Sequence, residues 1–304
     1  MNVISLFDGI SCARVALDKS KIKVKNYYAC EIEKNAIEIS KKNYSDIIQL
    51  GSVIDFRKNM IGNKKIHLLI GGSPCQDLSI AKKNREGLEG SRSNLFYEYV
   101  RIMKLVKPKY FILENVASMP QKDRDIITEI MGVNPVMFNA SLVSAQCRKR
   151  YFWTNIKFEL PIDKGILLKD IIQPDAQVDE KFMCKSVALS ANCGGSGAKT
   201  GLYTMGRIVG RRINNEGHRD DNNKDINIKQ RIELRNDNKS NNLSTVQKDN
   251  ILVGQNIRKL TPIECERLQS LPDNYTEGIS LSNRYKCLGN AFNVNVVSHI
   301  LNNI

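Results

Sequence analysis

A cysteine that directly follows a glycine–proline turn is the residue of this sequence best suited to nucleophilic chemistry. The apolar run at residues 67–70 has the length of a short buried strand, and it ends at Gly71 and Gly72, where other groups can approach the backbone closely. Pro74 then fixes the backbone immediately before Cys75. Such a thiol would be held at the carboxyl end of a parallel strand, where open α/β sheets place their chemistry. A small apolar cysteine packed in a turn is the alternative that these residues leave open.

The first two expected strands end in residues suited to a nucleotide-like ligand. The run at residues 2–6 leads into a turn at Gly9, and a helix is expected from about Cys12, so backbone N–H groups could face such a ligand. The second strand ends at Glu31, which could accept hydrogen bonds from ribose hydroxyls or could simply lie at the start of the following helix. The GxGxxG fingerprint is absent, so a dinucleotide bound through its phosphates is not indicated.

Acid–base candidates stand at two later strands. The expected strand at residues 109–116 carries Glu114 and Asn115 at its carboxyl end. Apolar residues directly before Glu114 favour a perturbed pKa and a proton-handling role, although capping of the next helix is equally consistent. Further on, alternation places Arg148 and Arg150 on one face beside another expected strand.

Composition narrows the class of protein. The 304 residues are 41% hydrophobic and 26% charged, which is typical of a soluble globular chain with a real core. We find no apolar run long enough to span a membrane and no secretory signal, so a cytoplasmic location is expected. The eight cysteines form no metal-binding cluster, so no metal is expected. A net charge of +14 favours a nucleic-acid partner, with a lysine-rich genome as the alternative explanation.

The chain changes character near residue 160. Before it, short apolar strands alternate with amphipathic segments, which predicts a mostly parallel sheet. The polar stretch 79–93 could be a loop that orders over a substrate, or merely a solvated one. Residues 160–253 are rich in Gly, Asn and charged residues, and regular structure resumes at a capping box formed by Thr261 and Glu264. Within the polar region, arginines suited to phosphates or guanine edges lie among acidic neighbours; they are Arg207, Arg211 and Arg212.

Taken together, these segments resemble the cytosine-5 DNA methyltransferases, and the resemblance covers nearly the whole chain. The segments, in the order of that family, are Phe7-Asp8-Gly9, Gly72-Ser73-Pro74-Cys75-Gln76, Glu114-Asn115-Val116, Gln146-x-Arg148-x-Arg150, Arg258-x-x-Thr261-Pro262-x-Glu264-x-x-Arg267-x-Gln269 and Gly289-Asn290-Ala291. The type is bacterial or phage, with some likeness to the animal de novo branch.

The resemblance implies a catalytic role for several residues. The Cys75 thiolate would add to C6 of a cytosine flipped out of a DNA duplex, after which C5 can accept a methyl group from S-adenosylmethionine. Glu114 would stabilise the charge that builds toward N3, and Arg150 would hold O2 or orient Glu114. Supporting catalytic residues are Gln76, Asn115 and Arg148, and expected DNA contacts besides the three arginines are Ser79 and Arg92.

The same resemblance implies a set of cofactor-binding residues, and the sequence departs from the family pattern at two positions. The set is Phe7, Asp8, Gly9, Glu31, Ser52, Pro74, Leu95, Asn290 and Ala291. Ser11 stands where the second glycine of the usual FxGxG is expected. Ser52 stands where an acid usually faces the adenine amine, and Asp55 is a candidate substitute.

The implied architecture is a Rossmann-like α/β fold with a seven-stranded, mostly parallel sheet and a second, smaller target-recognition domain. Residues 1–160 and 281–304 would form the catalytic domain and 161–280 the recognition domain, with double-stranded DNA in the cleft between them. The C-terminal helix should return to pack beside the first strand. A monomer is expected, and a cognate restriction endonuclease acting separately is one possible partner.

Three competing interpretations remain open. A related branch methylates cytosine in tRNA, but it typically carries a Cys-Phe-Thr tripeptide, whereas the cysteines of the variable region here precede Lys185 and Gly194. A catalytically inactive nucleic-acid-binding homologue is disfavoured by the presence of Cys75, Glu114 and Arg150. A nicotinamide oxidoreductase fits the expected sheet but lacks the phosphate fingerprint.

Overall fold

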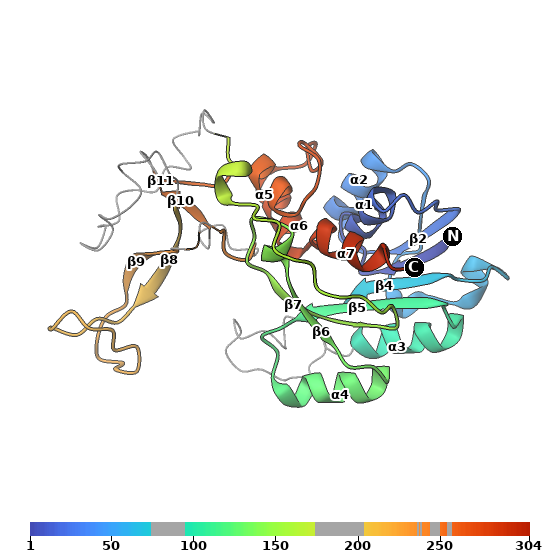
Figure 1. Cartoon of the computed structure of the whole chain (residues 1–304), viewed down its shortest axis with the longest axis horizontal. Helices are drawn as coiled ribbons and strands as arrows, with labels where there is room; N and C mark the ends of the chain where they lie inside the picture. The colour runs from blue at the N-terminus through green and yellow to red at the C-terminus, as the bar shows by residue number, and fades with distance from the viewer. Residues whose placement is uncertain (74–94, 174–203, 236, 238, 244–249, 254–256) are drawn as a thin grey trace.

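The described part of the chain contains one large and one small β-sheet (Figure 1). The computed structural model describes residues 1–73, 95–173, 204–235, 237, 239–243, 250–253 and 257–304. The large sheet has seven strands, which are β1 (Asn2–Leu6), β2 (Asn26–Cys30), β3 (Ile47–Gln49), β4 (Leu68–Gly72), β5 (Tyr110–Val116), β6 (Val136–Asn139) and β7 (Lys149–Thr154).

Strand order in the large sheet is β3-β2-β1-β4-β5-β7-β6, and β1 to β5 are mutually parallel. Only β7 runs against its neighbours, because it pairs antiparallel with both β5 and β6. This arrangement confirms the predicted mostly parallel, seven-stranded α/β fold. It brings the carboxyl ends of β1, β2, β4 and β5 to one edge of the sheet, where ligands of such folds bind.

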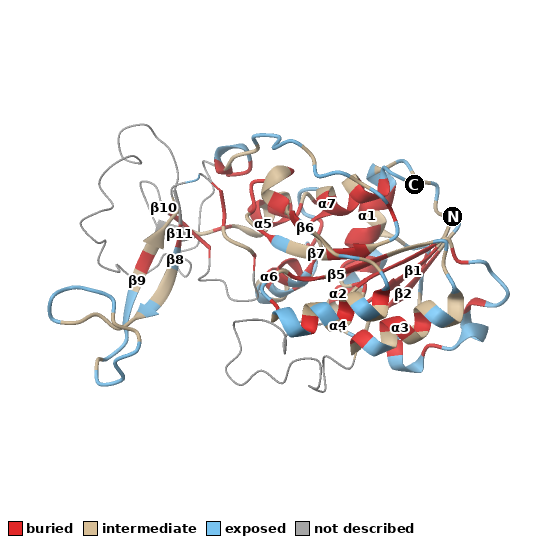
Figure 2. Ribbon diagram, turned by 60° about the horizontal axis from the view of Figure 1, so that its bottom comes forward, coloured by how far each residue is buried: buried red, intermediate tan, exposed pale blue. Residues whose placement is uncertain are grey.

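Helices cover both faces of the large sheet, which explains why its strands read as continuous apolar runs (Figure 2). The helices are α1 (Cys12–Lys19), α2 (Lys34–Asn43), α3 (Leu95–Val106), α4 (Gln121–Met131), α5 (Pro262–Leu268), α6 (Leu281–Asn290) and α7 (Val294–Leu301). Along β4, Leu68 and Ile70 point into the core shared with α1, α2 and α7, whereas Leu69 points into the core shared with α3 and α4.

The C-terminal helix packs beside the start of the chain. Helix α7 lies against α1, and the hydroxyls of Ser20 and Ser298 are 2.8 Å apart where the two helices meet. Val3 of β1 belongs to the same core as the buried residues of α7. The segment just before α7 is thereby fixed next to the central strands.

Helix α5 begins with the predicted capping box. The Glu264 N–H donates to Thr261 Oγ1 at 3.2 Å, and the Thr261 N–H donates to Glu264 Oε2 at 2.7 Å. Residues around this helix share the core of α1 and α7, and the Tyr275 hydroxyl donates to the Ile10 carbonyl at 2.7 Å. The domain boundary at residue 280 stays a prediction, and these contacts favour placing it closer to residue 260.

The small sheet is antiparallel, in the order β11-β10-β8-β9. Its strands are β8 (Thr204–Arg211), β9 (Lys229–Leu234), β10 (Ile251–Val253) and β11 (Ile257–Lys259). The eight residues of β8 were not anticipated, because charged residues on one of its faces hide the alternation of apolar side chains. No helix in the described ranges is long and apolar enough to cross a membrane.

Candidate active site

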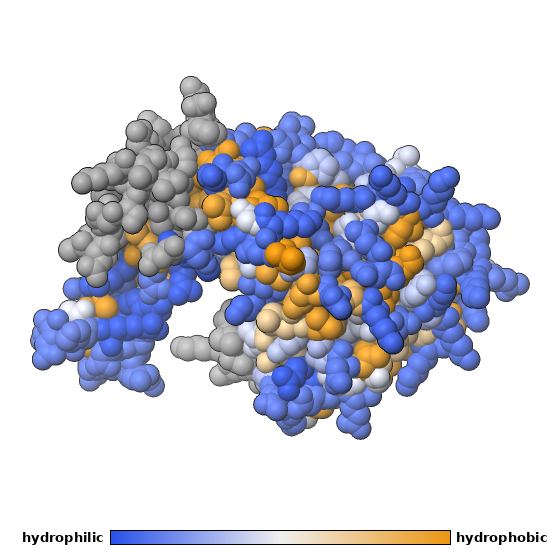
Figure 3. Space-filling view, viewed as in Figure 1, coloured by the Kyte–Doolittle hydropathy of each residue, from blue (hydrophilic) through white to orange (hydrophobic). Residues whose placement is uncertain are grey.

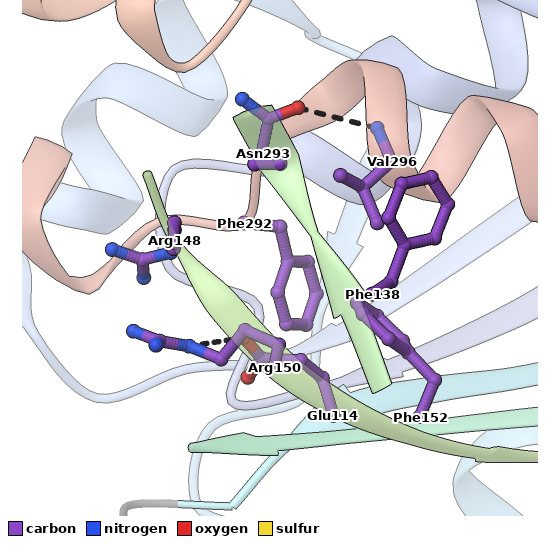
Figure 4. Close-up of a pocket in the computed structure, with 9 residues that line it drawn as sticks. Glu114, Phe138, Arg148, Arg150, Phe152, Phe292, Asn293 and Val296 are labelled. Atoms are coloured by element: carbon purple, nitrogen blue, oxygen red, sulfur yellow. Dashed lines mark hydrogen bonds and ion pairs between the residues drawn. The ribbon is translucent and has the colours of Figure 1, made fainter. Parts of the chain in front are cut away.

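An ion pair between neighbouring antiparallel strands lies at the centre of the candidate active site. Glu114 is on β5, opposite Phe152 of β7, and Arg150 precedes Phe152 by two residues on the same face. Arg150 Nε lies 2.8 Å from Glu114 Oε1, and the two side chains are only 12% and 13% exposed, respectively. Figure 4 shows the guanidinium directed at the carboxylate. The structure thus brings together the two residues expected to act on the cytosine ring.

Gly72 provides the space that this carboxylate occupies. It lies beside Glu114 in the parallel pairing of β4 and β5. A Cβ atom at Gly72 would lie 2.9 Å from Glu114 Oε2 and 2.8 Å from the ring of Phe292. Both distances are too short for real Cβ contacts, so this position requires glycine as long as the carboxylate and the ring stay in place.

The ring of Phe292 lines a small cavity behind the ion pair, together with Arg148 and Asn293 (Figure 4). The cavity is also lined by side chains of β6, β7 and α7, namely Phe138, Phe152 and Val296. Apolar neighbours on this side exclude water from the inner flank of the carboxylate and strengthen its interaction with the guanidinium.

Asn115 ties the end of β5 to the end of β4. Its side chain is buried, and Nδ2 donates to Ser73 Oγ at 3.2 Å while Oδ1 accepts the Val116 N–H at 2.8 Å. Ser73 is the last residue that the structure describes before the gap at residues 74–94. The structure therefore places the start of the predicted thiol segment at the ion pair's edge of the sheet. Several predicted site residues lie outside the described residues; they are Pro74, Cys75, Gln76, Ser79 and Arg92.

The Arg148 guanidinium donates hydrogen bonds to backbone carbonyls and to an asparagine side chain, and it does not pair with Glu114. Its Nη1 donates to Asn242 Oδ1 at 2.6 Å, and its Nη2 donates to the carbonyls of Gly289 and Ala291 at 3.3 and 2.9 Å. The side chain is buried. Because the two carbonyls flank Asn290, Arg148 fixes the turn that carries this residue and supports the site through it.

The turn after β1 has an unusual backbone. Phe7, Gly9 and Ser11 have φ angles of 55°, 58° and 60°. Positive φ at a bulky residue such as Phe7 is uncommon, and such strain gathers at ligand sites. The Gly9 N–H donates to Glu31 Oε2 at 2.8 Å, so the ends of β1 and β2 are joined through that carboxylate.

Glu31 is held in one orientation by backbone donors. Its Oε1 accepts the N–H groups of Ile32 at 2.7 Å and Glu33 at 2.8 Å. The next side chain, Ile32, is 73% exposed although it is large and apolar. Ile32 was not among the residues predicted from the sequence. The signal that could have indicated it is an apolar residue directly after an acid that ends a strand.

Asp8 does not face this edge with its side chain. The carboxylate is buried, and it accepts hydrogen bonds from the hydroxyls of Tyr27, at 2.7 Å, and Ser11. Burial raises the pKa of Asp8 to about 6, although the hydroxyl of Ser11 acts in the opposite direction. Ser11 also lies 2.6 Å from the hydroxyl of Ser40, so it has a hydrogen-bonding role that a glycine would lack.

The remaining cofactor candidates are spread along the same edge. Ser52 caps the short helix Val53–Asp55, since its Oγ accepts the Ile54 N–H at 3.2 Å, while Asp55 is exposed. Leu95 is half-buried at the start of α3, and Asn290 is exposed at the end of α6. Within the described residues, no group of three His, Cys, Asp or Glu side chains is arranged to hold a metal ion.

The three arginines expected to contact DNA are all on or beside β8. Arg207 and Arg211 both pair with Glu233 of β9, at 2.7 and 2.6 Å. Arg212 instead donates to carbonyls of the connecting loop, those of Ile226 at 3.1 Å and Asp221 at 3.2 Å.

Comparison with known proteins agrees with this architecture. The family model for C-5 cytosine-specific DNA methylases matches residues 1–304. Type II methyltransferase M.HhaI of Haemophilus parahaemolyticus is 27% identical, over 100% of this chain and 94% of its own length. Type II methyltransferase M1.ScrFI of Lactococcus lactis subsp. cremoris is also 27% identical, over 98% and 76%. A solved mutant of Spodoptera frugiperda DNMT2 has the same fold, with a TM-score of 0.67 at 19% identity over 99% of this chain and 98% of that one.

The large sheet, with its single antiparallel strand β7 and its ligand edge at the ends of β1 to β5, has the architecture of a class I methyltransferase. Within that class, the chain belongs to the C-5 cytosine-specific DNA methylase family. It is a DNA cytosine-5 methyltransferase, which confirms the resemblance read from the sequence.

Proposed function

We propose that this enzyme transfers a methyl group from S-adenosylmethionine to C5 of a cytosine flipped out of a specific double-stranded DNA sequence, through a covalent adduct with Cys75. The observation that carries the proposal is the Glu114–Arg150 ion pair next to Ser73, the residue from which the chain continues through Pro74 to Cys75. A thiol two residues beyond Ser73 would reach the ring that the ion pair contacts.

Three residues are assigned to the covalent addition and to the charge that it places on the ring. The Cys75 thiolate adds to C6, and negative charge moves toward N3 and O2 of the ring. Glu114 shares a proton with N3, and Arg150 holds the Glu114 carboxylate in place and contacts O2. The electron-rich C5 would then take the methyl group, with S-adenosylhomocysteine as the leaving group. Water would accept the proton that C5 loses, and expulsion of the Cys75 thiolate would restore the C5–C6 double bond.

The residues at the ends of β1 and β2 suit an adenosine group. Glu31 presents an anionic acceptor for ribose hydroxyls, and the exposed side chain of Ile32 offers an apolar surface for the face of an adenine. Asn290 on the Arg148-held turn would line the same edge. When bound, S-adenosylmethionine supplies an electrophilic methyl group on a sulfonium. Ser52 would leave the adenine amine without the usual acid partner.

We further propose that the enzyme acts as a monomer with DNA between the two sheets. In this proposal a cognate endonuclease acts separately from the methyltransferase; the support is that two relatives are named as type II methyltransferases.

The experiment that tests this function is a methyl-transfer assay with labelled S-adenosylmethionine. Unmethylated genomic DNA and total tRNA are compared for the wild type, Cys75→Ser and, as a thiol control, Cys147→Ser. Label in DNA that requires Cys75 and survives Cys147→Ser is the expected result, and bisulfite sequencing then gives the target sequence. Label in tRNA alone would replace DNA by RNA as the substrate. Activity of Cys75→Ser at the wild-type rate would exclude the adduct.

A further inference from the structure

The hairpin of β8 and β9 extends beyond the rest of the small sheet as a two-stranded ribbon. Strand β10 pairs only with residues 204–206 of β8, whereas β9 continues the pairing as far as Arg211 and Lys229. Figures 1 and 3 show this hairpin as a mainly hydrophilic projection that stands apart from the large sheet and its helices. A two-stranded ribbon of this kind is narrow enough to enter the major groove of B-DNA, which is about 12 Å wide.

The two faces of the ribbon differ strongly in character. Side chains on one face are Arg207, Val209 and Arg211 of β8, directly opposite Glu233, Arg231 and Lys229 of β9. The other face combines glycines with apolar residues and, at its outer end, the exposed Gln230. A Cβ atom at Gly206 would lie 3.0 Å from Ile232 Cγ2, so this glycine lets the isoleucine fold across the strand. Ile232 is buried in consequence. The basic face is therefore the face of the ribbon on which a polar partner could bind.

Glu233 holds two arginines of the basic face at once. Its Oε2 accepts from Arg207 Nε at 3.0 Å and Nη2 at 2.7 Å, while its Oε1 accepts from Arg211 Nε at 2.6 Å. The guanidinium of Arg211 lowers the pKa of Glu233, so the carboxylate is ionised at neutral pH. Both guanidiniums keep N–H groups that Glu233 does not use, because each has five and gives at most two to the carboxylate.

Arg231 lies in the middle of this face, opposite Val209. No carboxylate of the described residues pairs with Arg231 or with Lys229. With Glu233 as its single anion, the basic face carries four cations and a net charge of +3 (4 − 1). A second carboxylate, that of Asp221 in the connecting loop, also pairs with Arg211 at 3.7 Å, at one end of the ribbon.

We infer that the basic face of the β8–β9 ribbon enters the major groove of the target duplex, where Arg231 reads a guanine and Glu233 positions Arg207 and Arg211. An arginine donates two parallel hydrogen bonds to O6 and N7 of guanine, and an arginine pre-oriented by a carboxylate loses less conformational freedom on binding. The inference rests on the proposed function, because it names the residues with which the DNA methyltransferase would choose its target.

The test uses a library of synthetic duplexes in which one cytosine is flanked by randomised base pairs. Methylated products are sequenced for the wild type, Arg231→Ala and Arg231→Lys. The wild type should require guanine at one position or more. Arg231→Ala should lose the preference at one of these positions by about 10- to 100-fold, and Arg231→Lys should lose less of it, because an ammonium also donates to O6 and N7 of guanine. Lys64→Ala is the matched control. Lys64 is an exposed cation in the loop that precedes β4, so it lies at the amino end of that strand and not at the carboxyl end, where the candidate active site is.

Glu233→Gln tests the positioning role. Without the carboxylate the two arginines are held less firmly, so sequence preference should weaken. Affinity for a short fluorescein-labelled duplex of unrelated sequence should rise at low salt, because one negative charge has been removed. A merely structural role would instead lower thermal stability and both kinds of binding together.

The outcomes separate this inference from the function on which it rests. If the wild type methylates DNA at a defined sequence and Arg231→Ala keeps the full preference, the inference is wrong and the function stands. If Arg231→Ala weakens binding to all duplexes equally and lowers the salt slope by about one, Arg231 contacts a phosphate and the base assignment is wrong. If the wild type labels only tRNA, the proposed function itself fails.

Discussion

The Arg150 guanidinium holds the Glu114 carboxylate 2.8 Å from its Nε, across the antiparallel pairing of β7 and β5. The pair comes from two strands whose side chains alternate in register, so its geometry is set by the sheet rather than by a loop. A preorganised donor–acceptor pair needs little reorganisation when charge develops on a substrate, and in many enzymes such electrostatic stabilisation accounts for most of the rate enhancement.

Glu114→Gln should lower the rate of methyl transfer by about 100- to 1000-fold, the cost of losing one well-placed transition-state partner. The amide retains the size of the carboxyl group and an oxygen for Arg150, so the fold and DNA binding should persist. Single-turnover transfer of labelled methyl groups measures the effect. Glu98→Gln is a matched control, because Glu98 pairs with Arg101 at 2.7 Å on α3. A wild-type rate for Glu114→Gln would remove Glu114 from the mechanism.

Gly72→Ala should disable the site by displacing the Glu114 carboxylate and the Phe292 ring. The new methyl group would lie 2.9 Å from Glu114 Oε2 and 2.8 Å from the Phe292 ring, so both side chains must shift away from it. We expect a loss of about 100-fold in single-turnover rate, since a shift of about 1 Å in a catalytic group has that effect. Equilibrium unfolding in urea should show a loss of about 1–3 kcal/mol from overpacking.

Gly132→Ala separates the two effects of that substitution. Gly132 ends α4 with a φ of 68°, and nothing lies within 4 Å of an added Cβ. Its replacement should cost about 1 kcal/mol of stability through backbone strain while leaving the rate unchanged. If both variants lost the same free energy of unfolding and both kept the wild-type rate of methyl transfer, the space beside Gly72 would not be needed for catalysis.

The large sheet could be predicted because its signals are local. Strands β2 and β4 are apolar runs that stop at an acid or a glycine, at Glu31 and Gly72, and parallel pairing carries these ends to one edge. Glu114 could be placed at that edge in this way, whereas Arg150 joined it in one site only through the resemblance to the cytosine-5 DNA methyltransferases, because Arg150 lies on the antiparallel strand β7. The ribbon was missed because Arg207 and Glu233 stabilise each other only across β8 and β9.

Other contributions depend on contacts between residues far apart in the chain. The role of Arg148 as a catalytic support stays a prediction, and its hydrogen bonds to the carbonyls of residues 289 and 291 could not be foreseen, because a carbonyl has no signature in the sequence. Phe292 reads as an ordinary apolar residue, although its ring fills the space beside Gly72. The side chain of Asp8 turns inward because Tyr27 and Ser11 offer it hydroxyls, which the motif alone could not show.

Arg148→Lys should weaken cofactor binding more than it slows chemistry. A single lysine ammonium cannot replace both Nη atoms of Arg148, which donate to Asn242 Oδ1 and to the Gly289 and Ala291 carbonyls. The Ala291 carbonyl keeps a donor in Gln269 Nε2, at 3.4 Å, but a buried group that loses its partner costs about 1–3 kcal/mol. The turn that carries Asn290 should loosen, so the Kd for S-adenosylhomocysteine should rise about 10-fold with a smaller change in single-turnover rate at saturation. Calorimetric titration measures this, with exposed Lys122→Ala as the control. An unchanged Kd would show that the turn does not bear on the cofactor.

Asp8→Asn should make the protein relatively more stable as pH rises. Because burial raises the pKa of Asp8 from 3.8 to about 6, the native carboxyl holds its proton more tightly than the unfolded one. Stability from this group is therefore complete below about pH 4 and is lost as pH rises through about 6, by roughly 3 kcal/mol in total. The asparagine has no proton to lose, and it can accept from Tyr27 and donate to Ser11.

Urea unfolding of the wild type and of Asp8→Asn between about pH 4 and about pH 8 measures the difference, in which the titration of all other groups cancels. Ser11→Ala provides a variant of opposite sign, because the Ser11 hydroxyl lowers the pKa of Asp8 and its loss should deepen the penalty at neutral pH. A difference between Asp8→Asn and the wild type that stays constant over this range would show that the buried carboxyl does not titrate there. Asp8 would then contribute nothing to the pH dependence of the protein's stability in this range.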